Sequence, residues 1–187
     1  MFTGRTISFK EKLRLADAAP TLTRLGSGSA RVVFGVDLTT GTRRGPSVMK
    51  IAKNTKGLRQ NLAEAQLYVK YNFYPPYMTP MISWDDNDDC DTAWISVMKA
   101  GAYSETAFWN HFGVPFKTFS DCLSEHINHG RMNPRVTTQA IRDFVRWVEQ
   151  NDLMLGEFRQ GTNWGTYNSK PVILDAGLTH ANYAIAV

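Results

Sequence analysis

The sequence predicts an α+β protein, in which a five-stranded antiparallel sheet with one helix forms the first hundred residues and a mostly helical part follows. Three observations support this prediction. Two β-rich runs meet at a turn that contains Gly26 and Gly28, and a third run follows at Val48–Ala52. One helical pattern and two more β-rich runs complete the first part, and a twisted sheet with one packed helix is a natural way to bury such elements. After Gly101, helical patterns dominate.

The composition is that of a globular protein. Of the 187 residues, 43% are hydrophobic and 12% aromatic, which is enough for a packed core and excludes wholesale disorder. The net charge of +4 is scattered, so the charge permits nucleic-acid binding without indicating it. Two distant cysteines fit a reducing compartment, and no apolar run approaches the length of a membrane span. We therefore expect a soluble, cytoplasmic protein that contacts no membrane.

Local patterns predict the elements of the first part. A short helix is expected at Ile7–Ala18 and a longer one at Thr55–Asn72, which Thr55 can cap. The longer helix carries Glu64 on the flank of an apolar stripe with helical spacing, formed by Leu58, Leu62, Ala65 and Val69. The expected strands are the run from Thr21 to the glycine turn, Arg31–Leu38, Val48–Ala52, Met81–Trp84 and Thr92–Met98.

In the second part we expect three helices and one strand. Ser104 can cap the first helix, the other two have apolar residues on an inner face, and the strand is a short apolar run after a polar segment. The helices are Ser104–His111, Ser120–His129 and Thr137–Asn151, and the strand is Pro171–Asp175.

The turn around Gly26 and Gly28 can cover a phosphate chain. Small residues let the main chain approach a ligand, and N–H groups in such a turn can point at an anion. Lys50, in the middle of the third run, would add a positive charge. Taken alone, such residues are more often just a hairpin turn and a solvated lysine on an edge strand.

The order of these parts resembles the protein-kinase-like fold, and six short motifs carry the resemblance. LGSGSARVV at Leu25–Val33 is similar to the glycine-rich loop, and VMK at Val48–Lys50 is similar to the strand that carries the phosphate-contacting lysine. Glu64 is similar to the glutamate that pairs with this lysine, and WISVMKAG at Trp94–Gly101 is similar to the fifth strand and the hinge. Asn163 and LDAGLT at Leu174–Thr179 are similar to the two metal-binding elements. Arg31 stands where the third glycine of the loop is usual.

The resemblance implies ATP and Mg²⁺ as ligands. The implied nucleotide site consists of Gly26, Ser27, Gly28, Ser29, Lys50, Met98, Lys99 and Ala100. The implied metal ligands are Asn163 and Asp175, and Glu64 would hold Lys50 in place for phosphoryl transfer. Residues 1–100 would form a small lobe with an N-terminal helix, and residues 101–187 a reduced, mostly helical large lobe.

Three departures from the family pattern bear on catalysis. Phe158 occupies the position where the resemblance places the catalytic aspartate, and Glu157 beside it is the nearby carboxylate that would orient a hydroxyl or act as base. Ala176 replaces the phenylalanine that usually follows the metal aspartate. The sequence ends twelve residues after Asp175, so we expect a truncated large lobe.

More narrowly, the chain is similar to small kinase-like proteins of tailed bacteriophages. These share a GSGS-R-V loop, a KG..QN...E helix and an NWG...PV..D.GLT end. The similarity implies a protein that works in the cytoplasm of an infected host cell. We expect a degenerate kinase-like protein, a pseudokinase, that binds a nucleotide and engages a host protein. The alternatives are an active minimal phosphotransferase that uses Mg-ATP and, more distantly, a nucleic-acid-binding protein.

Two other segments invite a metal-site interpretation. Asp85–Asp91 has the odd spacing of a calcium loop but lacks the glycine and glutamate that such a loop requires, so we interpret it as a solvated turn. Cys122, His126 and His129 share one helical face but have no clear fourth zinc ligand. We expect a buried cysteine beside two surface histidines.

Overall fold

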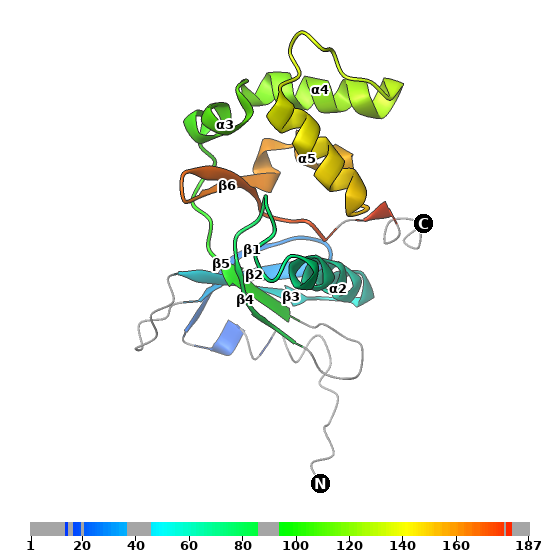
Figure 1. The fold of residues 1–187 in the computed structure, drawn as a ribbon. Coiled ribbons are helices and arrows are strands. Elements are labelled where there is room, and N and C mark those ends of the chain that lie inside the picture. The colour runs from blue at the N-terminus through cyan, green and yellow to red at the C-terminus, as the bar shows by residue number, and fades with distance from the viewer. Residues whose placement is uncertain are drawn as a thin grey trace. The chain divides into compact units, whose positions relative to one another are not determined.

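The computed structural model describes residues 14, 17–19, 21–36, 46–85, 94–177, 179 and 180 (Figure 1). Most of the predicted helix Ile7–Ala18 and most of the Asp85–Asp91 turn lie outside these described residues. The chain divides into two compact units. The first unit comprises Met1–Gln66 and Pro80–Lys99, and the second comprises Leu67–Thr79 and Ala100–Val187. Within the described ranges, no helix is long and apolar enough to cross a membrane.

The first unit contains a five-stranded antiparallel sheet, which confirms the predicted α+β fold class. Its strands are β1 (Leu22–Ser27), β2 (Arg31–Val36), β3 (Ser47–Ala52), β4 (Met81–Trp84) and β5 (Trp94–Met98). The first three strands form a meander, and β5 pairs with β3 while β4 lies at the edge. In the resulting order, β1-β2-β3-β5-β4, the central strand is β3, the strand that carries Lys50.

The helix after β3, α2 (Thr55–Lys70), does not bury the face that the apolar pattern predicts. Two of the four stripe residues, Leu62 and Val69, are 37% and 53% exposed. The buried face instead includes Asn61 and Glu64, which are both 0% exposed. The predicted stripe is therefore wrong in half of its members, because polar side chains that have partners on the sheet take the place of apolar ones.

Gly57 lets the first turn of α2 lie against the turn between β1 and β2. A Cβ atom added to Gly57 would lie 2.2 Å from the main-chain oxygen of Ala30 and 3.1 Å from the Cα atom of Ala52. The same Ala30 oxygen accepts a hydrogen bond from the main-chain N–H of Lys53 at 2.8 Å. The atoms that an added Cβ would meet belong to the main chain of Ala30 and Ala52, so they cannot move away from it at low energetic cost.

Gly57→Ala is expected to destabilise the first unit by about 3 kcal/mol. Overpacking usually costs about 1–3 kcal/mol, and a clash with main-chain atoms falls at the upper end of that range. Gly26→Ala is the matched control, because a Cβ atom added there meets no heavy atom within 4 Å. We expect the control to change the free energy of unfolding by less than about 0.5 kcal/mol. Urea unfolding measures both, and equal stability of the two variants would contradict the close approach at Gly57.

The three helices predicted for the second unit are present in the predicted order, and their boundaries differ from the prediction by a few residues. They are α3 (Glu105–Phe112), α4 (Phe116–His129) and α5 (Gln139–Gln150). Ser104, the first residue of the predicted helix, caps α3, because its side chain accepts a hydrogen bond from the Ala107 N–H at 3.2 Å. The helix α4 begins well before the predicted Ser120, directly after Pro115.

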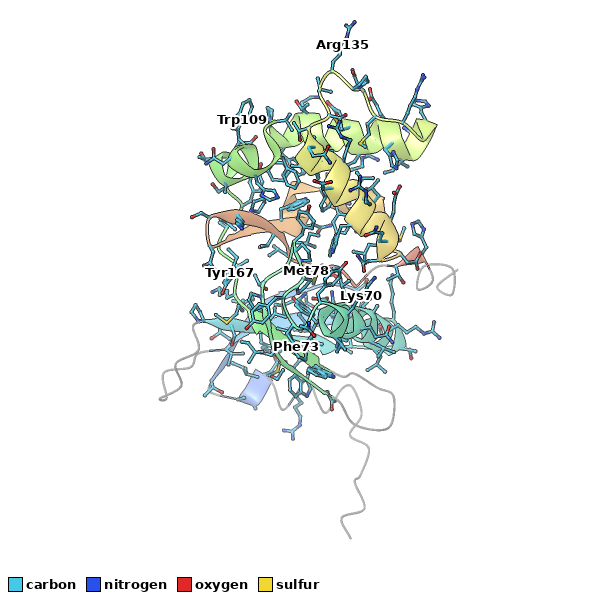
Figure 2. All side chains as sticks on the ribbon, viewed as in Figure 1. Lys70, Phe73, Met78, Trp109, Arg135 and Tyr167 are labelled. Carbon is cyan, nitrogen blue, oxygen red and sulfur yellow. The ribbon has the colours of Figure 1, made fainter. Side chains whose placement is uncertain are left out.

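An aromatic cluster forms the core of the second unit. The rings of Phe108 and Phe112 lie 4.6 Å apart between centroids, and Phe108 lies 5.0 Å from Phe119 and 5.3 Å from Trp164. All four side chains are buried. Trp109, the neighbour of Phe108 on α3, is half exposed and projects from the helix (Figure 2). Large rings carry much apolar area, so this cluster fixes where the segment after α5 docks.

Two short strands after α5 form a hairpin, and the sequence predicts only the second of them. The segment runs through η1 (Leu155–Arg159), η2 (Gly161–Asn163), β6 (Trp164–Tyr167) and β7 (Lys170–Ile173). The turn residues Asn168 and Ser169 have φ angles of 48° and 61°, the left-handed pair that two-residue hairpin turns favour. A Cβ atom on Gly165 would lie 2.8 Å from the Gly101 oxygen, so β6 needs glycine there.

Candidate functional site

Lys50 lies within the central strand and is only 5% exposed. Its Nζ forms an ion pair with Oε1 of Glu64, which is itself fully buried. The pair joins α2 to the middle of the sheet. The ion pair that the resemblance implies is therefore present, and neither residue is the solvated surface charge that its local sequence would suggest.

A second cation shares the same carboxylate. Arg31, the first residue of β2, donates through Nη1 to Glu64 Oε2 at 2.8 Å and to Asn61 Oδ1 at 3.1 Å, and it is 5% exposed. In the sequence, Arg31 stands out only as the residue in place of the usual third glycine of the loop. The strand register places Arg31 near Lys50. Val33 of β2 pairs with Lys50 of β3, and Arg31 lies two residues from Val33, on the same face of the sheet. Each oxygen of Glu64 thus binds one cation.

The turn between β1 and β2 is tied to the residues that follow β3. The main-chain N–H of Gly28 donates to Arg31 O at 2.9 Å and closes the turn. Lys53 Nζ donates to Gly28 O at 2.8 Å, and Asn54 Nδ2 donates to Ser29 O at 3.1 Å. Together with the bond from the Lys53 N–H to Ala30 O, these hydrogen bonds hold the segment that we predict to cover a phosphate chain.

The packing of the protein requires neither Gly26, near the end of β1, nor Gly28, in the turn. A Cβ atom added to Gly26 meets no heavy atom within 4 Å, and one added to Gly28 meets only Arg31 O at 3.9 Å. Ser27, between them, is exposed and its Oγ donates to Gly28 O at 3.4 Å. The space beside the turn is compatible with the close approach of a phosphate chain to the main chain.

Met98 and Lys99, in the predicted hinge of the nucleotide site, use their main-chain donors within the fold. The N–H of Met98 donates to Pro80 O at 2.9 Å, and the N–H of Lys99 donates to Pro46 O at 2.8 Å. A base at this segment would have to bind other main-chain groups. Ala100 belongs to the second unit.

The β6–β7 hairpin brings Asn163 and Asp175 close together in the second unit. Its register pairs Trp164 with Ile173, and the Leu174 N–H donates to Asn163 O at 2.9 Å. The two predicted metal ligands therefore lie just beyond the paired ends of the strands.

The side chains of this pair are suitable for a hard cation. Asn163 donates through Nδ2 to the main-chain oxygen of Glu157 at 2.8 Å, which fixes the amide so that Oδ1 faces away from that bond. Asp175 Oδ1 accepts from the Gly177 N–H at 3.1 Å. An amide oxygen and one carboxylate are a donor set that Mg²⁺ uses when substrate phosphates and water complete its shell.

Phe158 is part of the aromatic core. It is 1% exposed, and its ring lies edge-on to Phe144 at 5.5 Å between centroids. Its main-chain oxygen accepts from Trp164 Nε1 at 3.0 Å. The position where the resemblance places an aspartate is therefore a packing position, and the role of the partly exposed Glu157 as base stays a prediction.

The structure gathers the predicted residues into two groups, each within one unit. In the first unit, Lys50 and Glu64 meet Arg31 at the end of the glycine turn. In the second unit, Asn163 contacts Glu157 and lies beside the segment that leads to Asp175.

The cysteine and histidines of α4 have separate partners. His126 Nε2 lies 2.7 Å from Glu149 Oε1 on α5, and the buried Cys122 accepts from Thr137 Oγ1 at 3.6 Å. Burial raises the pKa of the Cys122 thiol, so the thiol stays protonated at neutral pH. Within the described residues, no group of three or more His, Cys, Asp or Glu side chains is placed to hold a metal ion.

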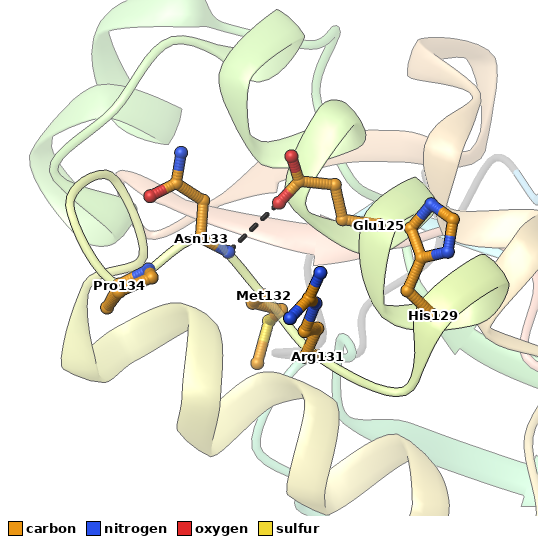
Figure 3. A pocket seen from close by; sticks show the side chains of 6 residues that line it. All are labelled: Glu125, His129, Arg131, Met132, Asn133 and Pro134. Carbon is orange, nitrogen blue, oxygen red and sulfur yellow. Dashed lines mark hydrogen bonds between the residues drawn. The ribbon is translucent and has the colours of Figure 1, made fainter.

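His129 lines an open pocket of about 300 Å³ at the end of α4 (Figure 3). The other lining residues are Glu125, Arg131, Met132, Asn133 and Pro134. Glu125 Oε2 accepts from the Asn133 N–H at 2.9 Å, so this carboxylate serves the loop after α4. The charged side chains of the lining are exposed, and nothing in their chemistry selects a ligand.

Comparison with known proteins gives a likeness of fold. No model of a protein family matches the sequence, and no curated protein matches it significantly. Among solved structures, the chain is similar to the kinase domain of PknI from Mycobacterium tuberculosis, with a TM-score of 0.45 and 12% identity. The match covers 86% of this chain and 61% of that domain. This level of likeness assigns no activity. The strand order and the helix after β3 match the small-lobe arrangement that the resemblance implies.

Proposed function

We propose that the chain binds a nucleotide through its phosphate chain and acts as a degenerate kinase-like module that engages a host protein. The observation that carries nucleotide binding is the buried ion pair between Lys50, on the central strand β3, and Glu64, on α2. Buried ion pairs add little stability compared with apolar packing, so their presence argues for a role beyond folding.

Phosphate binding suits the chemistry of this group. A lysine ammonium is a compact charge that neutralises phosphate oxygens, and Glu64 fixes its direction. The glycines at 26 and 28 leave space for the main chain to cover the phosphates. Within the second unit, Asn163 and Asp175 would hold Mg²⁺ through an amide oxygen and a carboxylate.

The proposal favours a binding role over efficient catalysis. Phosphoryl transfer depends on a group that orients the attacking hydroxyl. At the position where the resemblance places that group, the side chain of Phe158 is buried among aromatic rings. A host-directed effect should therefore survive both Lys50→Met and Asp175→Ala in cells that express the protein. Loss of the effect in both variants, with the fold intact, would count against a pure interaction role.

Lys50→Met is expected to weaken Mg-ATP binding by about 10- to 100-fold, the equivalent of a charged hydrogen bond. Lys56→Met is the matched control, since Lys56 is exposed on α2 and should bind as the wild type does. Calorimetric titration measures both dissociation constants. In a thermal unfolding assay, ligand at a hundred times its dissociation constant should stabilise the wild type by about 2.7 kcal/mol. No stabilisation at millimolar nucleotide would remove nucleotide binding from the proposal.

An active phosphotransferase is the second candidate, and the placement of Glu157 favours it. Its main-chain oxygen accepts a hydrogen bond from the side chain of Asn163, so a residue that carries a carboxylate is held to a predicted metal ligand. The test is transfer of labelled phosphate from Mg-ATP by wild type and by Glu157→Gln. Turnover that needs Lys50, Asp175 and Glu157 would establish this candidate, and absence of turnover would remove it.

A further inference from the structure

Arg31 occupies the end of the glycine turn and contacts the carboxylate that holds Lys50. Its Nη1 lies 2.8 Å from Glu64 Oε2, while Lys50 Nζ binds Oε1 of the same side chain. We propose that Arg31 is a positioning residue, which holds Glu64 independently of Lys50 and keeps the lysine directed at the phosphate chain. The phosphate part of this inference rests on the proposed function.

The strand register explains how two cations reach one carboxylate. Arg31 faces Ala52, and Val33 faces Lys50, so Arg31 and Lys50 are diagonal neighbours on one face of the sheet. Glu64 thereby ties two adjacent strands, β2 and β3, to the same point of α2. If either cation is removed, the other still neutralises the carboxylate.

Arg31 also docks the glycine turn on the helix. Besides Glu64, it binds Asn61 Oδ1 at 3.1 Å, one turn earlier on α2. Glycine, the residue that the resemblance leads us to expect here, has no side chain that could make these contacts. With Lys53 and Asn54 bound to the carbonyl groups of the turn, the segment above the predicted phosphate position is held to α2 and to the end of β3. The turn is therefore a fixed part of the site.

The first test is a double-mutant cycle of stability, which needs no ligand. Lys50→Met alone should raise the unfolding equilibrium constant only modestly, because Arg31 still neutralises Glu64. In the Arg31→Met background, the same change leaves a buried carboxylate without either cation, so it should raise the constant at least tenfold more. Urea unfolding measures all four proteins. If the effects of Arg31→Met and Lys50→Met on the free energy of unfolding are additive, the two residues do not share Glu64 and the proposal is overturned.

An apolar control keeps this test valid if the double variant does not fold. Adding Glu64→Met to Arg31→Met and Lys50→Met removes the isolated carboxylate, and replacement of a whole buried charge group by apolar residues is often tolerated. We expect the triple variant to fold and to be more stable than the double variant. A triple variant no more stable than the double one would show that lost packing, and not the lone carboxylate, causes the defect.

The second test asks whether Arg31 positions Lys50 for phosphate. Arg31→Met should raise the dissociation constant for Mg-ATP about tenfold and leave that for adenosine unchanged, and Arg31→Lys should retain most of the Mg-ATP affinity. Parallel losses for both ligands, or no change for either, would overturn the positioning role. If the wild type binds neither ligand, the proposed function fails, whereas the stability cycle still decides whether Arg31 and Lys50 share Glu64.

Discussion

Glu64→Gln is expected to lower the free energy of unfolding by about 3–5 kcal/mol, the cost of removing one partner from a buried ion pair. Glu64 is 0% exposed, and each of its oxygens binds a cation. Glutamine carries no charge, and its amide nitrogen would face the side chain of either Arg31 or Lys50. The loss should be concentrated in the first unit. Urea unfolding measures the total, and hydrogen exchange of peptides from β2, β3 and α2 locates it.

The matched control for this prediction is an exposed ion pair. Asp121 lies 2.7 Å from Lys117 on the surface of α4, with 62% of the aspartate side chain exposed. Such pairs contribute little, so Asp121→Asn should cost no more than about 0.5 kcal/mol. If Glu64→Gln costs no more than this control, the buried arrangement of the three charges is wrong.

Phe158→Asp is expected to destabilise the second unit by at least about 4 kcal/mol. This substitution would place an aspartate at the position where the resemblance implies one. Removing a buried phenylalanine ring alone costs about 3–5 kcal/mol, and a carboxylate in its place adds a desolvation penalty. The ring is 1% exposed and packs against Phe144 and Trp164. We therefore expect no gain of phosphate transfer.

Phe158→Leu separates the two contributions in that prediction. Leucine keeps an apolar side chain in the cluster, so the loss should fall to about 1.5 kcal/mol. Both variants can be compared by thermal unfolding and by transfer of labelled phosphate from Mg-ATP. A folded Phe158→Asp variant that transfers phosphate would show that this position faces the reaction site.

The strands and the main contact of the site were predictable because they depend on local patterns and on order. Alternation and turn residues mark β1, β2 and β3, and Lys50 falls in the middle of one of these runs. The pairing of Lys50 with Glu64 follows from the resemblance, since neither side chain alone differs from an ordinary surface charge. The roles of these residues toward a nucleotide stay predictions.

The inner face of α2 was not predictable from hydrophobicity. A stripe of leucine, alanine and valine normally marks the buried side of a helix. Here Asn61 and Glu64 take that side because Arg31 supplies hydrogen bonds that compensate their burial. Arg31 itself is thirty-three residues from Glu64 in the sequence, and only the strand register shows that it shares a face with Lys50.

The strand β6 was missed for a different reason. Its four residues, Trp164–Tyr167, include glycine and threonine and lie within a polar segment, so they carry no alternating apolar pattern. Tertiary contacts form the strand instead: Trp164 enters the aromatic core, and Thr166 exchanges main-chain hydrogen bonds with Gly101 at 2.8 and 3.1 Å. The available signal in the sequence was Asn168, because asparagine favours the positive φ angles that Asn168 and Ser169 adopt in this turn.

The polar docking of α2 limits how this helix can move. A helix that lies on a sheet through apolar side chains can slide by part of a turn and find other contacts of similar energy. Glu64 allows no such alternative, since a small shift would separate it from Arg31 and Lys50 together and leave buried charges apart. In this protein α2 therefore has one stable position on the sheet. A regulatory mechanism that displaced this helix would have to overcome a large free-energy cost.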